Sequence, residues 1–439
     1  MIKKTLPIIT VRLEKIVGGG QTIATEENGR KLFVWGGLPG ELVEVQLTKK
    51  RSKMAEGFVF KVIEPSKNRI EPRDPESYLS TSPWQIMDFD SEQHFKSALI
   101  EEAFELHDIV LPEPISVFTD NQQYEYRNKI EFSWYWNKNT ELLDLAFFRR
   151  GSHGKMPVNG TSLANPNINK AALALRDLLR TKLNIHAFML KTVIIRCNES
   201  GNVAMQLYVK EQNFALLTKS DLEFLKTSAN MIGFELIFSN PLSPASVINK
   251  KLQEWGTTHL TDTIFDTQFI YTIDGFFQIN IPVYTQALTD MKKWVKKGKP
   301  LVDMYSGVGT IGLTIGSDDV TLIEINENAV AEARQNIQNL KTKKSVRLLL
   351  ASSENALDYI NSNSTIIVDP PRAGLHKDVV EKLLAESPER IIYLSCNPVT
   401  QARDVAILSE KYGILYHRGY NFFPRTPHIE HLVILEIRN

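Results

Sequence analysis

A glycine loop between an apolar strand and a helix constrains the fold of this chain more than any other feature of its sequence. In KPLVDMYSGVGTIGLTIG an expected strand at 301–305 runs through Gly307, Gly309 and Gly312 into an expected helix. Glycines at this spacing let the backbone approach a ligand closely, because no Cβ intervenes. Strands and helices alternate from about residue 265 onward, as in a doubly wound parallel sheet. The pattern predicts a Rossmann-like α/β domain over 265–439.

An acid stands at the end of the next expected strand. Glu324 in VTLIEIN lies where a carboxylate can accept hydrogen bonds from both hydroxyls of a ribose. Dinucleotide dehydrogenases and methyltransferases that use S-adenosylmethionine both need such an acid, and an ordinary charge at a strand end is the alternative interpretation. The following segment, NENAVAEARQNIQNLK, has apolar residues at helical spacing, which supports a strand–helix–strand unit.

Two later strands end in residues that can carry chemistry. STIIVDPPRAG is an apolar strand ending in Asp369, and the two prolines after it fix φ and remove two N–H donors. A dehydrogenase has no use for this rigid turn, whereas methyltransferases that act on nucleobases often place one beside the flipped base. RIIYLSCNP repeats the geometry and ends in Cys396, for which an inert core thiol is the alternative. Open α/β sheets bind ligands at this edge, so we expect the two residues to converge there.

A thiol at this edge suits the chemistry of a uracil ring. C5 of uracil is too weak a nucleophile to attack a methyl sulfonium unaided, but addition of a thiolate at C6 brings negative charge to C5. The C5 proton must leave afterwards, which requires a base near C5. The segment FFPRTPHIEHLVILEI supplies the candidates His428, Glu430 and His431, and a solvated surface glutamate is the alternative for Glu430.

The first part of the chain has the sequence pattern of a small β-barrel. Strand-length segments between residues 8 and 63 are separated by glycine-rich turns, which predicts an OB-like β-barrel over 1–66. Its KKRSKMAEG segment is expected to form a basic loop. This charge run is either solvated surface or a contact with nucleic acid, and its binding candidates are Lys49, Lys50 and Arg51.

A central α+β domain is predicted over 67–264, entered through a linker rich in proline and charge at 65–83. Its YEYRNKIEFSWYW segment sets Arg127 and Lys129 among five aromatic residues. Basic residues interleaved with aromatics suit a surface that neutralises phosphates and stacks on unpaired bases. A strand with one aromatic core face explains the pattern equally well.

Composition excludes several other classes of protein. Lys plus Arg and Asp plus Glu both number 51, so any basic surface must be local. The two cysteines, Cys197 and Cys396, cannot build a disulfide framework or a four-cysteine metal site. No run approaches a membrane span, and the N-terminal residues lack the features of a signal peptide. We expect a cytoplasmic monomer with no membrane partner.

With these residues in hand, the sequence resembles the TrmA/RumA type of RNA uracil-5-methyltransferases over essentially the whole chain. The motifs GFFQIN, YSGVGTIG, VDPPRAG, LSCNP and PHIE occur in family order at suitable spacing. The resemblance implies methylation of C5 of a uridine in RNA, with S-adenosylmethionine as cofactor, to give 5-methyluridine. It also implies that the N-terminal barrel is a TRAM domain, a small RNA-binding module.

The resemblance assigns roles to individual residues. Cys396 is the nucleophile, Glu430 the proton acceptor, and Asp369 lies close to the uracil as well as to the cofactor. Arg127 and Lys129 match a stretch that faces RNA. Of Phe276 and Phe277, one is expected in the core. The expected cofactor site comprises Gln278, Tyr305, Gly307, Gly309, Thr310, Glu324 and Asp369. Thr310 departs from the family, many members of which carry asparagine there.

A larger departure concerns metal. Several family members bind an iron-sulfur cluster through cysteines around the stretch that here reads RDPESYLSTSPWQIMDF, and this stretch has none. We therefore expect no iron-sulfur cluster and no other metal, and a structural role for Cys197. The TRAM-like barrel favours 23S rRNA as substrate, with transfer RNA as the alternative.

Three other functions compete with this one. Cytosine-5 enzymes place their cysteine in a proline-cysteine turn, where this chain has the acid and two prolines at 369–371. Amino-methylating enzymes want an aromatic residue where Arg372 stands. A non-catalytic RNA-binding protein would not need Cys396, Asp369 and Glu430 together.

Overall fold

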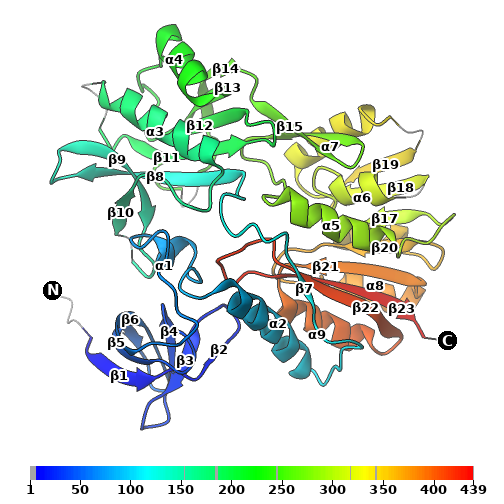
Figure 1. Cartoon of the computed structure of the whole chain (residues 1–439). Helices are drawn as coiled ribbons and strands as arrows, with labels where there is room; N and C mark the ends of the chain where they lie inside the picture. Colours follow the sequence, from blue (N-terminus) through cyan, green and yellow to red (C-terminus); the bar gives the residue numbers. More distant parts are fainter. Residues whose placement is uncertain are drawn as a thin grey trace.

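The computed structural model describes residues 6–152, 154–182, 186–243, 246–316, 318–341 and 344–438. Three large sheets of six, seven and eight strands follow one another along the chain (Figure 1). The architecture is α/β with an N-terminal β domain, as the sequence predicts. Within the described residues, no helix combines the length and the apolar character needed to cross a membrane.

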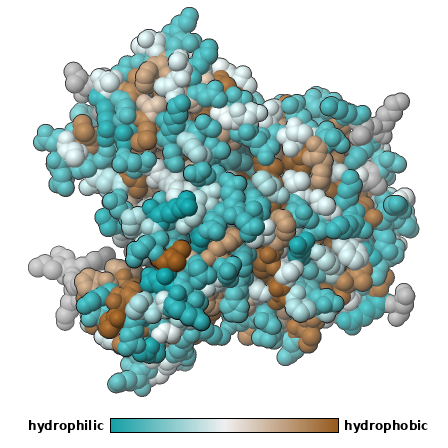
Figure 2. All heavy atoms as spheres, viewed as in Figure 1, coloured by the Kyte–Doolittle hydropathy of each residue, from teal (hydrophilic) through white to brown (hydrophobic). Residues whose placement is uncertain are grey.

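The N-terminal sheet is curled and has the strand order β1-β5-β6-β4-β3-β2. Its strands are β1 (Ile8–Arg12), β2 (Lys15–Ile16), β3 (Thr22–Thr25), β4 (Lys31–Trp35), β5 (Leu42–Lys50) and β6 (Met54–Glu64). Along β5 every second residue is buried, including Val43, Val45 and Leu47, so one face of the sheet forms the core. Figure 2 shows hydrophobic atoms over this domain, whose exposed apolar side chains include Ile8 and Phe60.

The basic segment of this sheet differs from its prediction as a loop. Lys49 and Lys50 are the last residues of β5, because the strand continues into its pairing with β6. The Lys49 Nζ atom lies 2.9 Å from Glu56 Oε1 on β6, so part of its charge is balanced within the sheet. Arg51 follows at the turn.

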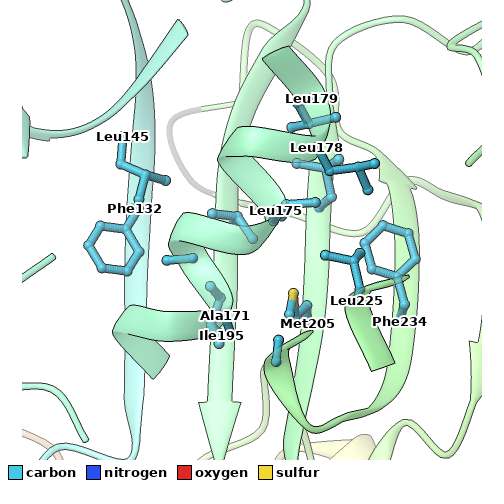
Figure 3. Close-up of a cluster of buried hydrophobic side chains, with 14 of the residues drawn as sticks. Phe132, Leu145, Ala171, Leu175, Leu178, Leu179, Ile195, Met205, Leu225 and Phe234 are labelled. Carbon is cyan, nitrogen blue, oxygen red and sulfur yellow. The ribbon is translucent and has the colours of Figure 1, made fainter. Parts of the chain in front are cut away.

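The second sheet has the strand order β10-β9-β8-β11-β12-β13-β14. Its strands are β8 (Lys129–Asn137), β9 (Leu142–Phe148), β10 (Lys155–Val158), β11 (Leu190–Cys197), β12 (Val203–Val209), β13 (Met231–Phe238) and β14 (Lys250–Gly256). Helices α3 (Pro166–Arg180) and α4 (Lys219–Ala229) lie on one face of it (Figure 1). Figure 3 shows Leu175 and Leu179 of α3 pointing towards strand residues such as Ile195. Phe132 and Trp134 also belong to this core, and Cys197 is buried in it.

The third sheet has the strand order β19-β18-β17-β20-β21-β23-β22-β7. Strands β17 to β21 pair in parallel, and β22 and β23 are antiparallel at one side. The strands are β17 (Leu301–Asp303), β18 (Asp319–Glu324), β19 (Ser345–Leu350), β20 (Thr365–Val368), β21 (Arg390–Ser395), β22 (Tyr412–Tyr420) and β23 (Glu430–Ile437). The helices between them are α5 (Ile281–Lys292), α6 (Thr310–Ile315), α7 (Glu327–Gln338), α8 (Lys377–Glu386) and α9 (Pro398–Leu408). This is the doubly wound sheet that the glycine loop predicts.

A segment that precedes the second sheet in the chain packs on the third. Strand β7 (Val117–Phe118) extends the third sheet beside β22. Helix α2 (Phe89–Glu105) lies beside α9, and its Ile100 and Phe104 share a core with Val433 of β23 (Figure 1). The sequence assigns this segment to the central domain, whereas in the structure it packs on the third sheet. The domain limits stay a prediction.

The second and third sheets share one continuous core. The hairpin β15 (His259–Ile264) and β16 (Thr267–Thr272) contributes Phe269 and Tyr271 to a cluster with Tyr208 of β12 and Leu322 of β18. The chain between β16 and α5, which holds the GFFQIN motif, is therefore fixed against both sheets.

Candidate active site

A cavity of about 950 Å³ opens at the carboxyl ends of β17, β18, β20 and β21. It brings together residues from Thr272 to Glu430, which are 158 positions apart, and many of them meet here because parallel strands end at the same edge of the sheet. The expected catalytic and cofactor residues that line it are Gln278, Tyr305, Gly307, Thr310, Glu324, Asp369, Cys396 and Glu430. Gly309, also expected at the cofactor site, is the N-cap residue of α6 and is not among the residues that line the cavity.

The glycine loop has the backbone that its glycines predict. Gly307 and Gly309 have φ angles of +54° and +90°, in the region that favours glycine. A Cβ added to Gly307 would meet nothing within 4 Å, so the backbone there faces open space. A Cβ on Gly312 would lie 2.4 Å from Leu322 Cδ2, so this glycine lets α6 pack closely on β18. The loop thus offers bare backbone to a ligand.

Glu324 ends β18 at the wall of the cavity and orders two backbone segments around it. Its Oε2 atom accepts a hydrogen bond from the Gly307 N–H at 2.9 Å, and its Oε1 atom accepts one from the Asn326 N–H at 2.7 Å. The neighbouring Ile325 is 68% exposed and lines the cavity. A carboxylate next to an apolar side chain suits a ribose that carries a flat base.

Two acids, Asp369 and Glu430, approach each other from different strands. Asp369 follows β20, and Glu430 begins β23 and is 5% exposed. Burial and the charge of Asp303 raise the pKa of Asp369 to about 7. Burial, together with the charge of Asp369, raises the pKa of Glu430 well above its ordinary value. Both groups therefore favour their neutral form until a positive charge enters the cavity.

The thiol of Cys396 lies beside these acids, one residue beyond the end of β21. Burial is the main cause that raises its pKa to about 11, and the charges of Glu430 and Asp369 add to the effect. The Arg372 guanidinium acts in the opposite direction. The free site thus holds a neutral thiol within the electrostatic range of two carboxyl groups.

Arg372 and His428 lie at the same end of the cavity. The Arg372 Nη2 atom is 2.9 Å from His428 Nδ1. Burial and the charge of Arg372 lower the pKa of His428 to about 4, so the imidazole is neutral near pH 7 and serves as an acceptor for the guanidinium. The backbone carbonyl of Arg372 accepts a hydrogen bond from Asn397 Nδ2 at 2.9 Å, which ties the turn after Asp369 to the residue after Cys396.

The GFFQIN segment forms another part of the wall and is held by two cationic side chains, the buried Arg196 and the half-buried Lys129. Arg196 donates to the carbonyl oxygens of Gly275 at 2.6 Å and Phe277 at 2.9 Å. Lys129 donates to those of Asp274 and Gly275, both at 3.2 Å. Phe277 is 2% exposed and Phe276 is 70% exposed, which confirms that one of the two phenylalanines belongs to the core.

Sequence reasoning missed Arg196 and Tyr284. Arg196 is fully buried at the end of the apolar run LKTVIIRC, and a charge in such a run is the signal that could have marked it. Tyr284 of α5 lines the cavity and its hydroxyl lies 2.8 Å from Thr310 Oγ1. Its position in the sequence is indistinguishable from that of a core aromatic residue on a helix.

The expected RNA-binding residues lie outside the cavity. Lys129 uses its ammonium to support the GFFQIN segment, and burial lowers its pKa to about 8. Arg127 is half-buried and its Nε atom lies 3.4 Å from the hydroxyl of Tyr126. Lys49, Lys50 and Arg51 belong to the N-terminal sheet, and none of the five lines this wall. Their contact with RNA stays a prediction.

Comparison with known proteins identifies the family. The family model described as tRNA (Uracil-5-)-methyltransferase matches residues 90–438. The chain belongs to the tRNA (uracil-5-)-methyltransferase family. The resemblance seen in the motifs is thereby confirmed. All the residues that line the cavity, from Thr272 to Glu430, lie within the matched region.

Relatives of this methyltransferase cover nearly its whole length. An uncharacterised RNA methyltransferase of Enterococcus faecalis is 28% identical over 427 residues, which is 92% of each chain. One of Fusobacterium nucleatum is 28% identical over 99% of this chain and 96% of its own. The Pyrococcus abyssi tRNA (uracil-54, C5)-methyltransferase, solved with S-adenosyl-L-homocysteine, aligns with a TM-score of 0.77 at 22% identity. That alignment covers 98% of this chain and 100% of the other, so the two share the fold.

No metal site is formed by the part of the chain that the structure describes, since no group of three or more histidine, cysteine, aspartate or glutamate side chains is arranged to hold an ion.

Proposed function

We propose that this protein methylates C5 of a uridine in RNA with S-adenosylmethionine, using Cys396 as nucleophile and Glu430 as proton acceptor. The observation that carries the proposal is the meeting of a thiol, two acids and a glycine loop in one cavity. A dehydrogenase needs neither the thiol nor the paired acids. A non-catalytic RNA-binding protein would not need three reactive groups whose pKa values are all raised.

The residues of the cavity fit S-adenosylmethionine. Glu324 suits the ribose hydroxyls, Ile325 suits one face of the adenine, and the open backbone at Gly307 suits the amino-acid tail. The residues that would hold the cofactor are Gln278, Tyr305, Gly307, Gly309, Thr310, Glu324 and Asp369. When bound, S-adenosylmethionine supplies the methyl group and a positive sulfonium charge. A positive charge beside acids and a thiol lowers their pKa values.

The chemistry begins with Cys396. Its thiolate forms a bond with C6 of the uracil, and the electron pair of the C5–C6 double bond moves towards C5 and the O4 carbonyl. The nucleophilic C5 then takes the methyl group, and the electron pair of the broken carbon–sulfur bond stays on the departing S-adenosylhomocysteine. Asp369, beside the thiol, is placed to hold the uracil edge by a hydrogen bond while it carries its proton.

Glu430 completes the reaction. Its carboxylate removes the proton from C5, the electron pair of that C–H bond re-forms the C5–C6 double bond, and the C6–S bond breaks to return the thiolate of Cys396. Glu430 is the first residue of β23, and Cys396 follows the last residue of the neighbouring strand β21. Acid and thiol therefore line the same cavity.

The RNA substrate is the second part of the proposal. One candidate is 23S rRNA, which the TRAM-like barrel favours from the sequence. Transfer RNA is the second, because the family description names tRNA and the Pyrococcus abyssi enzyme aligns over 98% of this chain. Since that alignment extends over the barrel, a barrel alone does not separate the two substrates. In either RNA the target base must leave its stack to reach Cys396.

The test uses purified protein, S-adenosylmethionine, and either 23S rRNA or transfer RNA tritiated at C5 of uridine. We expect tritium to appear in water with the wild type and to be absent with Cys396→Ala. The RNA that releases tritium identifies the substrate. Release that persists in Cys396→Ala would overturn the role of the thiol, and no release from either RNA despite cofactor binding would overturn uridine methylation.

A second variant separates the two chemical steps. Glu430→Gln keeps the size of the side chain but removes the base, so the thiol can add to C6 and C5 can be methylated while the proton stays. We expect a covalent protein–RNA adduct to accumulate on denaturing gels. Rapid tritium release by Glu430→Gln would contradict the proposed proton acceptor.

A further inference from the structure

The loop that leads into Glu430 is anchored on a buried ion pair outside the cavity. This β22–β23 loop comprises residues 421–429. The ion pair is formed by Glu92 and Lys96 of α2, whose Oε1 and Nζ atoms lie 3.1 Å apart and whose side chains are 0% exposed. Neither residue lines the cavity. Removing two charges from water costs several kcal/mol for each, so such a pair needs further hydrogen bonds.

Those hydrogen bonds go to the β22–β23 loop. Lys96 Nζ donates to Asn421 Oδ1 and, at 3.1 Å, to the carbonyl oxygen of Phe423. Glu92 Oε1 accepts from Asn421 Nδ2 at 2.9 Å, and both Glu92 carboxylate oxygens lie 3.0 Å from the Arg425 backbone N–H. The ion pair is therefore satisfied by three residues of a loop more than 320 positions away in the sequence.

The backbone of the loop is held in an uncommon conformation. Arg425 has a φ angle of +65°, which few residues other than glycine adopt. Its Nη1 atom donates to the carbonyl oxygen of Met87 at 2.7 Å, and its own carbonyl accepts from the Trp84 N–H at 3.2 Å. A conformation of this kind persists only where the surroundings determine it, and here they include the Glu92 carboxylate, which binds the Arg425 N–H.

Asn421 connects the ion pair to the catalytic acid. It follows Tyr420, whose partner in the antiparallel pairing of β22 and β23 is Glu430. Both polar atoms of the Asn421 side chain are bonded to the ion pair. The position of Glu430 is therefore linked to α2 through the Asn421 side chain and the pairing of β22 with β23, in addition to the loop contacts at Phe423 and Arg425.

We infer that Glu92 and Lys96 are positioning residues that set Glu430 for removal of the C5 proton. The inference rests on the proposed function, in which Glu430 is the proton acceptor. It predicts that loss of the ion pair slows proton removal and leaves cofactor binding and thiol addition intact, because the glycine loop and Cys396 are supported by other elements.

The test is the double variant Glu92→Gln/Lys96→Met, which removes one buried charge of each sign and so leaves the net charge beside the buried Arg425 guanidinium unchanged. The measurements are S-adenosylmethionine affinity by calorimetry, adduct on denaturing gels, and tritium release from the RNA that the wild type uses. We expect release to slow by roughly tenfold or more, since small displacements of a reacting group cost this much. The adduct should accumulate, and the cofactor affinity should not change.

The control is Lys15→Met/Glu102→Gln, which makes the same substitutions at an exposed ion pair of 2.6 Å between the barrel and the same helix. It should match the wild type in all three measurements. Should the buried double variant fail to fold, Asn421→Ser keeps the ion pair and removes the hydrogen bonds that the Asn421 side chain makes to it, and slower release than in the wild type is again expected.

The outcomes separate the two proposals. If the wild type fails to release tritium from either RNA, the proposed function is overturned. If the wild type and Glu430→Gln behave as proposed but the double variant or Asn421→Ser releases tritium at the wild-type rate, only the positioning inference is overturned. Equal loss of cofactor binding, adduct and release would also overturn it, because a general structural role would then explain the effect.

Discussion

Three acids at or near the cavity, Asp303, Asp369 and Glu430, have pKa values raised by the same cause. Asp303 is fully buried at the end of β17, and Asp369 and Glu430 lie at the cavity. Burial is the largest contribution for each, and the charge of a neighbouring acid adds to it. The cost of burying negative charge here is offset when a cation binds, which is why a site with raised acid pKa values suits a sulfonium.

The pH dependence of catalysis follows from these groups. Asp369 has a pKa of about 7 and the Cys396 thiol one of about 11, and the reaction uses Glu430 and Cys396 in their deprotonated forms. We therefore expect kcat/KM for RNA, which follows the ionisation of the free enzyme, to rise with pH up to about 7 and to level off between about 7 and 9, because loss of the Asp369 proton then offsets the ionisation of the thiol. The check is the initial rate of tritium release at subsaturating RNA. A rate that falls over this range would contradict the assignment.

The pH dependence of stability follows from Asp303. Its Oδ2 atom accepts from the Gly312 N–H at 3.0 Å, and burial raises its pKa from 3.8 to about 7. Between these values the folded state keeps a proton that the unfolded state loses, so this group makes the free energy of unfolding fall as pH rises. Asp303→Asn should reduce that fall. Urea unfolding at pH 4 and pH 7 tests this, and an equal fall in variant and wild type would refute it.

At the scale of elements, the contact between α6 and β18 determines where the glycine loop lies. A Cβ on Gly312 would meet Leu322 at 2.4 Å and Val320 at 3.2 Å. Gly312→Ala should therefore lower the free energy of unfolding by about 1–3 kcal/mol, the usual cost of overpacking, and weaken S-adenosylmethionine binding because the loop moves with the helix.

A glycine elsewhere in the same sheet provides the control. At Gly413 of β22 the nearest atom to an added Cβ is 3.6 Å away, an ordinary contact. Gly413→Ala should change neither property. Urea unfolding and calorimetry measure both variants, and equal cofactor affinity in Gly312→Ala and the wild type would show that the helix contact does not control the loop.

At the scale of the whole molecule, the N-terminal barrel touches the loop that leads into the catalytic acid. A Cβ on Gly20 would lie 2.1 Å from Pro427 Cβ, and the Gly20 carbonyl accepts from Trp84 Nε1 at 3.1 Å. Figure 2 shows the surface hollowed between this barrel and the part of the molecule that carries the second sheet. The barrel is thus joined to the β22–β23 loop, which leads into Glu430.

Two neighbouring glycines test the barrel contact. Gly19 and Gly20 have φ angles of +92° and +87°, so alanine is strained at both, but only at Gly20 does a Cβ meet Pro427. We expect Gly20→Ala to release tritium from RNA more slowly than Gly19→Ala. Equal rates for the two variants would show that the contact with Pro427 does not matter for catalysis.

Much of this protein was determined by local sequence. The alternation along β5 predicts the barrel face, and the strand–glycine–helix pattern around Gly307 predicts the doubly wound sheet, because both follow from neighbours a few residues apart. The convergence of Asp369 and Cys396 was also predictable, since residues that end adjacent parallel strands must meet at one edge. These features depend only on the periodicity of the sequence and on the direction of the strands.

Tertiary structure alone decided what surrounds those residues. Nothing near Glu92 or Lys96 in the sequence indicates a buried ion pair, because the charges are satisfied by a loop more than 320 residues away. Lys129, predicted to face RNA, instead supports the carbonyls of the GFFQIN segment, and the segment with α2 and β7 joins the third sheet. The physical reason is that burial and hydrogen bonding of a charge depend on contacts across the whole chain, whereas strands, helices and their ends depend on local pattern.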